Sequence, residues 1–233
     1  MQRNIRAPAT SALLNEVFTP AYIAGSLLQT NPFKTAPRGR GERVLVWPGF
    51  GASNASTAAL RSYLRLLGYR TSGWDLGVNS GDVLTTLDVL KKHVMLESEN
   101  ARITLVGWSL GGYLAREVAR DCPNRVRHVV TLGSPVVGGP KYTSIARAFA
   151  DNQGSLDEIE RLVDERYQRP LTVPVTALYS KSDGVVAWQA CIDERSPNVE
   201  HVEVRTSHAG FGFDARAYQI VAERIAQHIG EAC

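Results

Sequence analysis

The sequence has few cysteines and a small net charge, and both features exclude classes of protein. Its 233 residues include three cysteines, Cys122, Cys191 and Cys233, which have no metal-ligand spacing and cannot all pair with one another. We therefore expect a reduced, cytoplasmic setting and no bound metal. The formal net charge of +3 arises from 26 basic and 23 acidic residues spread along the chain. This charge is too small and too dispersed to predict a nucleic-acid partner.

Long apolar runs and internal repeats are also absent from the sequence. No segment approaches the roughly 18 apolar residues of a membrane-spanning helix. The basic segment Met1–Arg6 is followed by neither the apolar region nor the cleavage site of a signal peptide. The sequence therefore predicts no transmembrane segment and no secretion, and the lack of a repeat argues against a solenoid.

The composition and periodicity of the chain favour an α/β fold. With 44% hydrophobic and 21% charged residues, residues 1–233 are expected to form one globular domain. After the first forty residues, short β-rich segments alternate with segments of helical periodicity. This alternation is typical of a mostly parallel sheet, here of about six strands, with helices on both faces. The expected strands cover residues 43–47, 69–74, 102–107, 127–132, 173–179 and 199–205.

Residues 1–41 precede this alternation and are expected to form an N-terminal helical extension. Its apolar side chains have the spacing of a short amphipathic helix: Leu13, Leu14, Val17 and Phe18. Because the polar face of this helix is not rich in lysine or arginine, packing on the edge of the sheet is favoured over an anchor on a membrane surface.

Residues 136–170 form a long insertion between two expected strands. Ser155–Glu158 has the pattern of a helix capping box, and Pro170 is expected to end the helix. The apolar side chains of this helix share one face: Leu156, Ile159, Val163 and Tyr167. Long connections at the carboxyl edge of a parallel sheet often form lids or pocket walls. We expect a lid in which Ile159 and Val163 contact substrate; the alternative is that this face completes the core.

The most specific motif is Gly107-Trp108-Ser109-Leu110-Gly111, which has the form G-x-S-x-G. It follows the apolar run Ile103–Val106 and precedes a segment with helical spacing. A serine at such a turn is held in a strained conformation with its hydroxyl exposed, and the glycines remove Cβ atoms that would collide with neighbouring backbone. The motif therefore predicts that Ser109 is a nucleophile.

A serine hydroxyl needs a base within hydrogen-bond reach and a third group that orients the base. Of the five histidines, His208 is favoured because it follows the last expected strand and can therefore reach the carboxyl edge of the sheet. Asp183 is favoured as the acid because it directly follows the strand expected over 173–179. Asp193 is the nearest alternative, in a segment with no strand signal of its own.

The order Ser109, Asp183, His208 is the order of catalytic residues in α/β-hydrolases. On these motifs, the chain resembles the esterase and lipase branch of the α/β-hydrolase superfamily over about residues 43–229. The resemblance implies the α/β-hydrolase fold. The expected strands begin at the one that the family counts as its third, so the resemblance implies a compact version that lacks the first antiparallel pair.

Acyl transfer also needs an oxyanion hole of backbone N–H groups. Leu110 supplies one N–H because it follows the nucleophile. The resemblance implies that Phe50, in the turn after the first strand, supplies the second. Pro48 stands where the family often has a histidine. The dinucleotide-binding pattern G-x-G-x-x-G would place glycines at positions 49, 51 and 54. This chain has Asn54 at the third of these positions, so the full pattern is absent and no cofactor is expected.

Together these residues predict a cofactor-independent serine hydrolase that acts through an acyl-enzyme intermediate. The resemblance to esterases and lipases implies that its substrates are small-molecule carboxylic esters. Aromatic side chains beside the motifs are expected to line an apolar acyl pocket, with core packing as the alternative: Trp47, Phe50, Trp108, Trp188 and Phe211. An acyltransferase would use the same triad with an alcohol or amine in place of water, and the sequence does not separate the two. A non-enzymatic ligand receptor is disfavoured because all three triad residue types are present.

Overall fold

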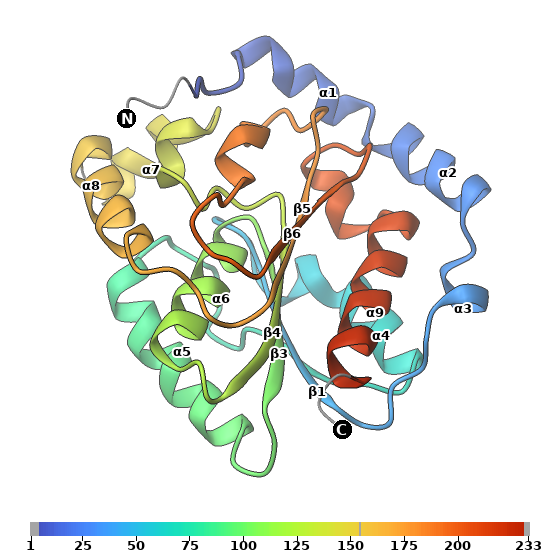
Figure 1. The fold of residues 1–233 in the computed structure, drawn as a ribbon. Coiled ribbons are helices and arrows are strands. Elements are labelled where there is room, and N and C mark those ends of the chain that lie inside the picture. Colours follow the sequence, from blue (N-terminus) through green and yellow to red (C-terminus); the bar gives the residue numbers. More distant parts are fainter. Residues whose placement is uncertain (1–4, 154, 231–233) are drawn as a thin grey trace.

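The computed structural model describes residues 5–153 and 155–230, which form a six-stranded sheet with helices packed around it (Figure 1). Cys233 lies outside these residues, as does most of the basic segment Met1–Arg6. The strand order is β2-β1-β3-β4-β5-β6, and every neighbouring pair is parallel. The strands are β1 (Arg43–Trp47), β2 (Arg70–Ser72), β3 (Ile103–Trp108), β4 (Val126–Leu132), β5 (Val175–Tyr179) and β6 (Val199–Glu203). Each overlaps one expected strand, and the predicted α/β fold is confirmed.

The apolar character of the central strands follows from their position between two helical layers. β1, β3, β4 and β5 are buried over nearly their whole length, as expected for a parallel sheet covered on both faces. The edge strand β2 has three residues, and its Arg70 is exposed. Parallel register pairs Trp47 with Gly107 and Trp108 with Leu132, so the carboxyl ends of β1, β3 and β4 meet at one edge.

The helices that cover the sheet are α4 (Ala58–Leu66), α5 (Val83–Glu97), α6 (Leu110–Asp121) and α9 (Ala215–Gly230). α5 and α6 cover one face, where Leu90 and Leu114 pack in a core with Leu105 (Figure 1). α4 and α9 cover the other face, where Ile225 packs in a core with Val106. Consecutive residues of β3 thus belong to opposite cores, as the alternation of side chains along a strand requires. Short 3-10 helices in the connections span Asn54–Thr57, Trp188–Cys191 and Ala209–Gly212.

The N-terminal segment forms a 3-10 helix (Thr10–Leu13) and the helices α1 (Leu14–Val17), α2 (Thr19–Gln29) and α3 (Pro32–Thr35). α2 and α3 pack against α9. The apolar side chains Leu14, Val17 and Phe18 are 64%, 72% and 59% exposed. The expectation that this apolar face packs on the edge of the sheet is wrong, because α1 contacts the rest of the chain through Glu16, whose carboxylate accepts three backbone N–H groups.

The insertion 136–170 holds two helices where one was expected. A 3-10 helix (Gly139–Tyr142) is followed by α7 (Ala146–Gln153) and α8 (Leu156–Tyr167). Ser155 precedes α8 but its side chain makes no capping hydrogen bond, so the predicted capping box is wrong. Asp157 in the first turn instead pairs with Lys141, at 2.8 Å between Nζ and Oδ1. This ion pair joins α8 to the 3-10 helix before it.

Candidate active site

Ser109 occupies the turn between β3 and α6. Its φ of +55° lies in the region that side chains other than glycine rarely adopt. Its backbone N–H donates to Leu132 O at 2.8 Å, and its carbonyl oxygen accepts the N–H of Gly112 at 3.0 Å. The neighbouring elements therefore determine this conformation, and strain of this kind is often found at functional sites.

Gly107 allows β3 and α6 to approach each other, and Gly111 allows α6 to approach the end of β1. A Cβ on Gly107 would lie 2.3 Å from the backbone N of Gly112, and one on Gly111 would lie 2.5 Å from Trp47 O. Cβ atoms do not approach backbone atoms so closely, so no larger residue fits at either position. The G-x-S-x-G spacing thus has a packing cause in this fold.

Asp183 and His208 lie in the loops that follow β5 and β6, and the structure brings their side chains together. His208 Nδ1 is 2.7 Å from Asp183 Oδ2. The other carboxylate oxygen, Asp183 Oδ1, accepts the backbone N–H groups of Val185 at 2.8 Å and Val186 at 2.7 Å. These bonds fix the orientation of the carboxylate. Because Nδ1 contacts Asp183, Nε2 is the ring nitrogen left to accept a proton.

Both loops reach the edge of the sheet at which Ser109 lies. The His208 ring is 5.9 Å from the Trp108 ring, centroid to centroid. A Cβ on Gly133, directly after β4, would lie 3.0 Å from Asp183 Oδ2 and 3.2 Å from His208 Nδ1. Within the described part of the chain, Ser109 Oγ is not hydrogen-bonded to His208. Catalytic hydrogen bonds are often long until substrate binds.

The electrostatic surroundings of His208 favour its protonated form. Burial alone would lower the pKa of this imidazole, but the nearby carboxylates outweigh that effect. Its charge and its hydrogen bond, with a further contribution from Glu16, raise the pKa of His208 above its ordinary value. The site therefore stabilises the imidazolium that a base forms when it takes a proton.

The alternative acid, Asp193, is engaged in contacts that stabilise the fold. Its carboxylate forms a buried ion pair with Arg116, and Asp193 Oδ1 accepts the N–H groups of Arg195 at 2.8 Å and Ser196 at 3.1 Å. Burial raises the pKa of Asp193, but Arg116 and these hydrogen bonds hold it below its usual range. None of its bonds involves His208. The geometry therefore favours Asp183 as the partner of the histidine.

The loop after β1 brings Phe50 close to Ser109. A Cβ on Gly49 would lie 3.0 Å from Ser109 Cβ, so a larger residue here would crowd Ser109. Among the described residues, neither the N–H of Phe50 nor that of Leu110 donates a hydrogen bond to another group of the chain. Both groups are therefore available as oxyanion donors.

The sequence analysis missed Asn79, which holds this loop in place. Asn79 is 1% exposed, and its side-chain amide donates to Pro48 O at 3.0 Å. Its backbone bonds to Gly51 and Ala52, each at 2.8 Å. Asn79 lies in no motif, and these contacts arise from tertiary structure. The one available signal was a polar residue within the Gly-rich connection before α5.

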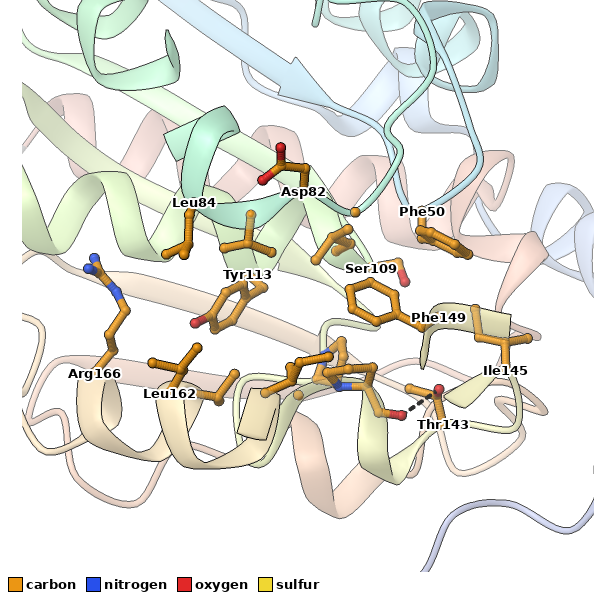
Figure 2. A pocket seen from close by; sticks show the side chains of 18 residues that line it. Phe50, Asp82, Leu84, Ser109, Tyr113, Thr143, Ile145, Phe149, Leu162 and Arg166 are labelled. Atoms are coloured by element: carbon orange, nitrogen blue, oxygen red, sulfur yellow. Dashed lines mark hydrogen bonds between the residues drawn. The ribbon is translucent and has the colours of Figure 1, made fainter. Parts of the chain in front are cut away.

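A cavity of about 170 Å³ opens beside Ser109 (Figure 2). Figure 2 shows Phe50 and Phe149 next to Ser109, with Arg166 at the far end. The cavity is bounded by the first turns of α5 and α6 and by the insertion 136–170. Its walls are mostly apolar, so it can accept an apolar group linked to a carbonyl near Ser109.

Some of the residues expected to contact substrate lie at this cavity. Ile159 and Val163 of α8 line it, and both pack against the core under α6. Tyr167 does not line it, because its ring packs with Val136 and Val137. One face of α8 therefore serves both the cavity and the core.

Four aromatic residues expected at the pocket lie elsewhere: Trp47, Trp108, Trp188 and Phe211. Trp47 and Phe211 are fully buried in the cores on opposite faces of the sheet. Trp108 packs on the face covered by α4 and α9. Trp188 stacks on Tyr179, with ring centroids 5.7 Å apart. Proximity in sequence to the motifs did not determine which face of the sheet these rings occupy.

The described residues contain neither a cluster of metal-ligating side chains nor a membrane-spanning helix. No group of three or more histidine, cysteine, aspartate or glutamate side chains there could hold a metal ion. None of the helices in residues 5–153 and 155–230 has the length and apolar composition needed to span a membrane.

A family model and several solved structures are similar to this chain and have the same type of fold. Residues 44–158 match a family model described as the alpha/beta hydrolase fold. A similar solved structure is Paleococcus ferrophilus monoacylglycerol lipase, at 16% identity and a TM-score of 0.64, with 82% of this chain and 97% of that chain covered. Another is Est1E from Butyrivibrio proteoclasticus, at 14% identity and a TM-score of 0.63, with 84% and 92% covered.

A thioesterase domain from the curacin biosynthetic pathway is also similar, at 15% identity and a TM-score of 0.58, with 80% of this chain and 93% of that chain covered. No curated protein sequence matches the chain. The chain is thus identified as a protein of the α/β-hydrolase fold, as its sequence resemblance predicts. Its fold is similar to that of a lipase and of a thioesterase domain.

Proposed function

We propose that this protein is a serine hydrolase that cleaves carboxylic esters with an apolar acyl group. The observation that carries the proposal is the 2.7 Å contact between His208 Nδ1 and Asp183 Oδ2, at the edge of the sheet where Ser109 has a positive φ. The apolar cavity beside Ser109 supports the apolar acyl group. The similarity to a lipase fold supports the reaction class.

In the proposed reaction, Ser109 Oγ attacks the ester carbonyl carbon while His208 Nε2 takes the hydroxyl proton. The carbonyl electron pair moves to oxygen, and the N–H groups of Phe50 and Leu110 stabilise that oxyanion. Asp183 stabilises the imidazolium. Collapse of the intermediate breaks the ester C–O bond, and the alcohol leaves with the proton from His208. Water then attacks the acyl-enzyme by the same steps and releases the acid.

The insertion 136–170 acts in this proposal as a lid within a single domain. Ile159 and Val163 lie at the wall of the cavity, which Phe50 also lines. The acyl chain would extend from Ser109 along this wall toward Arg166. This arrangement makes the lid a determinant of acyl length. The expected cytoplasmic location stays a prediction.

A panel of p-nitrophenyl esters of increasing acyl length, run beside matching amides and thioesters, tests the proposal. We expect ester turnover in the parent protein and its loss in a folded Ser109→Ala protein. Ester turnover that survives in Ser109→Ala, or a preference for amides or thioesters, contradicts the proposal. Product analysis with added alcohols separates hydrolysis from acyl transfer, because an acyltransferase would form the new ester in place of the acid.

A further inference from the structure

The carboxylate of Glu16, in α1, connects the two loops that carry the acid and the base. Glu16 Oε1 accepts the backbone N–H of Gly184 at 3.0 Å and that of His208 at 2.9 Å. Glu16 Oε2 accepts the N–H of Ala209 at 2.8 Å. Gly184 directly follows Asp183. One side chain from the N-terminal segment therefore bonds to the backbone beside Asp183 and to the backbone of His208 itself.

Further contacts hold the N-terminal segment against the same loops. Thr19 Oγ1 is 2.5 Å from Ser207 Oγ, and Ser26 Oγ accepts the N–H of Ala215 at 3.0 Å. A Cβ on Gly184 would lie 2.2 Å from Ala12 O, so this glycine lets the segment approach the loop. These contacts fix the position of Glu16.

We propose that Glu16 is a positioning residue for the acid–base pair, which holds the Asp183 and His208 loops at a fixed separation and places a second negative charge beside the imidazolium. The proposal rests on the proposed function of Ser109, Asp183 and His208. Glu16 touches no reacting atom and acts through His208. Glu16 lies in the N-terminal segment, outside residues 44–158, which match the family model.

The charges around His208 agree with this role. Asp183 contacts the imidazole from the loop after β5, and Glu16, in α1, bonds to the backbone N–H of the same histidine. The Trp108 ring, which is uncharged, lies 5.9 Å from the imidazole, centroid to centroid. Burial lowers the pKa of His208, and the two carboxylates together raise it above its ordinary value. Removing the charge of Glu16 should therefore lower this pKa, and the acidic limb of the activity profile should move to lower pH.

The test is a Glu16→Gln protein, which keeps the shape of the side chain but replaces one acceptor oxygen with a donor. We expect kcat to fall between about tenfold and a hundredfold, because small misplacements of catalytic groups have effects of that size. KM should change little, since the cavity is not altered. The midpoint of the acidic limb of kcat/KM should move to lower pH. A loss of structure alone would not move that midpoint.

Two further variants control for charge and for packing. Glu42→Gln removes another carboxylate near the N-terminal segment, one that accepts the N–H of Arg40, and should leave kcat and the pH profile unchanged. Thr19→Val removes the contact with Ser207 without changing charge, and should lower kcat without moving the midpoint. A midpoint that moves equally in Thr19→Val and Glu16→Gln would contradict the role of the charge.

Titration of His208 by NMR needs no substrate and separates this proposal from the proposed function. A lowered pKa of His208 in folded Glu16→Gln, together with the fall in kcat, supports the positioning role. An unchanged His208 pKa, or an unchanged kcat, overturns it. If the parent protein shows no ester turnover, the proposed catalytic role fails and the positioning role fails with it. A lowered pKa would then show only the contact of Glu16 with His208.

Discussion

Asn79 Nδ2 donates a hydrogen bond of 3.0 Å to the carbonyl oxygen of Pro48, and this contact orients the loop that carries Phe50. Asn79 Oδ1 accepts the N–H of Gly81 at 3.2 Å, so both ends of the amide are engaged. Proline has no polar side chain with which to hold the loop. A residue from the connection before α5 supplies that bond instead.

Replacing Asn79 with alanine should impair catalysis more than substrate binding. The change removes the hydrogen bond to the Pro48 carbonyl group, so the loop that carries the N–H of Phe50 can move away from the oxyanion position. Removing an oxyanion donor typically lowers kcat by about a hundredfold or more. Because the loop is displaced and not deleted, we expect a fall of about tenfold to a hundredfold with KM nearly unchanged. Steady-state kinetics on a p-nitrophenyl ester measures this. Asn198→Ala, which removes an exposed bond to Thr172 O, is the matched control. Equal kcat values for the two variants would exclude the role of Asn79.

The two aspartates should respond differently to conversion to asparagine. Asp183→Asn should lower kcat by several orders of magnitude with little change in stability, because the wrong imidazole tautomer is favoured. Asp193→Asn should leave Arg116 charged and buried without its partner, at a cost of roughly 3 to 5 kcal/mol in the free energy of unfolding. Kinetics and denaturant unfolding on both proteins check this. A stable Asp193→Asn protein with low kcat would transfer the catalytic role to Asp193.

The acidic limb of the kcat/KM profile should lie above the pH expected for an isolated histidine. Neutral His208 is the form that accepts the serine proton, so activity falls as the pH drops through its pKa. Burial lowers that pKa, but Asp183 and Glu16 raise it, so the midpoint should exceed the ordinary value of about 6.5. Asp183→Asn should move the residual activity to lower pH. A midpoint below 6.5 in the parent protein would contradict this electrostatic account.

Shortening the side chains of α8 should alter acyl-chain preference. Ile159→Ala enlarges the cavity and should shift the optimum toward longer acyl groups. Val163 is 5% exposed and packs in the core as well, so Val163→Ala should also cost about 1 kcal/mol in stability. The p-nitrophenyl panel and thermal melts measure both effects. Leu96→Ala, at a residue on α5 that is 67% exposed, serves as the control. An unchanged acyl profile in Ile159→Ala would assign α8 to the core alone.

The features that the sequence predicts well are those with local physical causes. Periodicity predicted all six strands, and the crowding of α6 against β3 and against the end of β1 explains why Gly107 and Gly111 mark the serine turn. The positions of Asp183 and His208 directly after neighbouring strands also allowed their contact to be predicted. Chain order and sheet topology were sufficient there, because parallel strands end at one edge.

The features that the sequence did not predict depend on contacts between distant segments. Asn79 and Glu16 act on backbone groups far along the chain, and neither lies in a motif. The face on which Trp47 packs depends on strand orientation, which its apolar character does not specify. The orientation of α1 was predicted from the spacing of its apolar residues. The carboxylate of Glu16 instead determines which side of the helix faces the rest of the chain.

Labelling with a fluorophosphonate, followed by peptide mapping, tests most directly the claim that Ser109 is the activated nucleophile. The account predicts one adduct, on Ser109, with labelling lost in Ser109→Ala and strongly slowed in Asp183→Asn. Ser62→Ala, at an exposed serine of α4, is a suitable control and should be labelled on Ser109 as fast as the parent protein. An adduct on another serine, or a folded protein that does not react at all, would contradict the account.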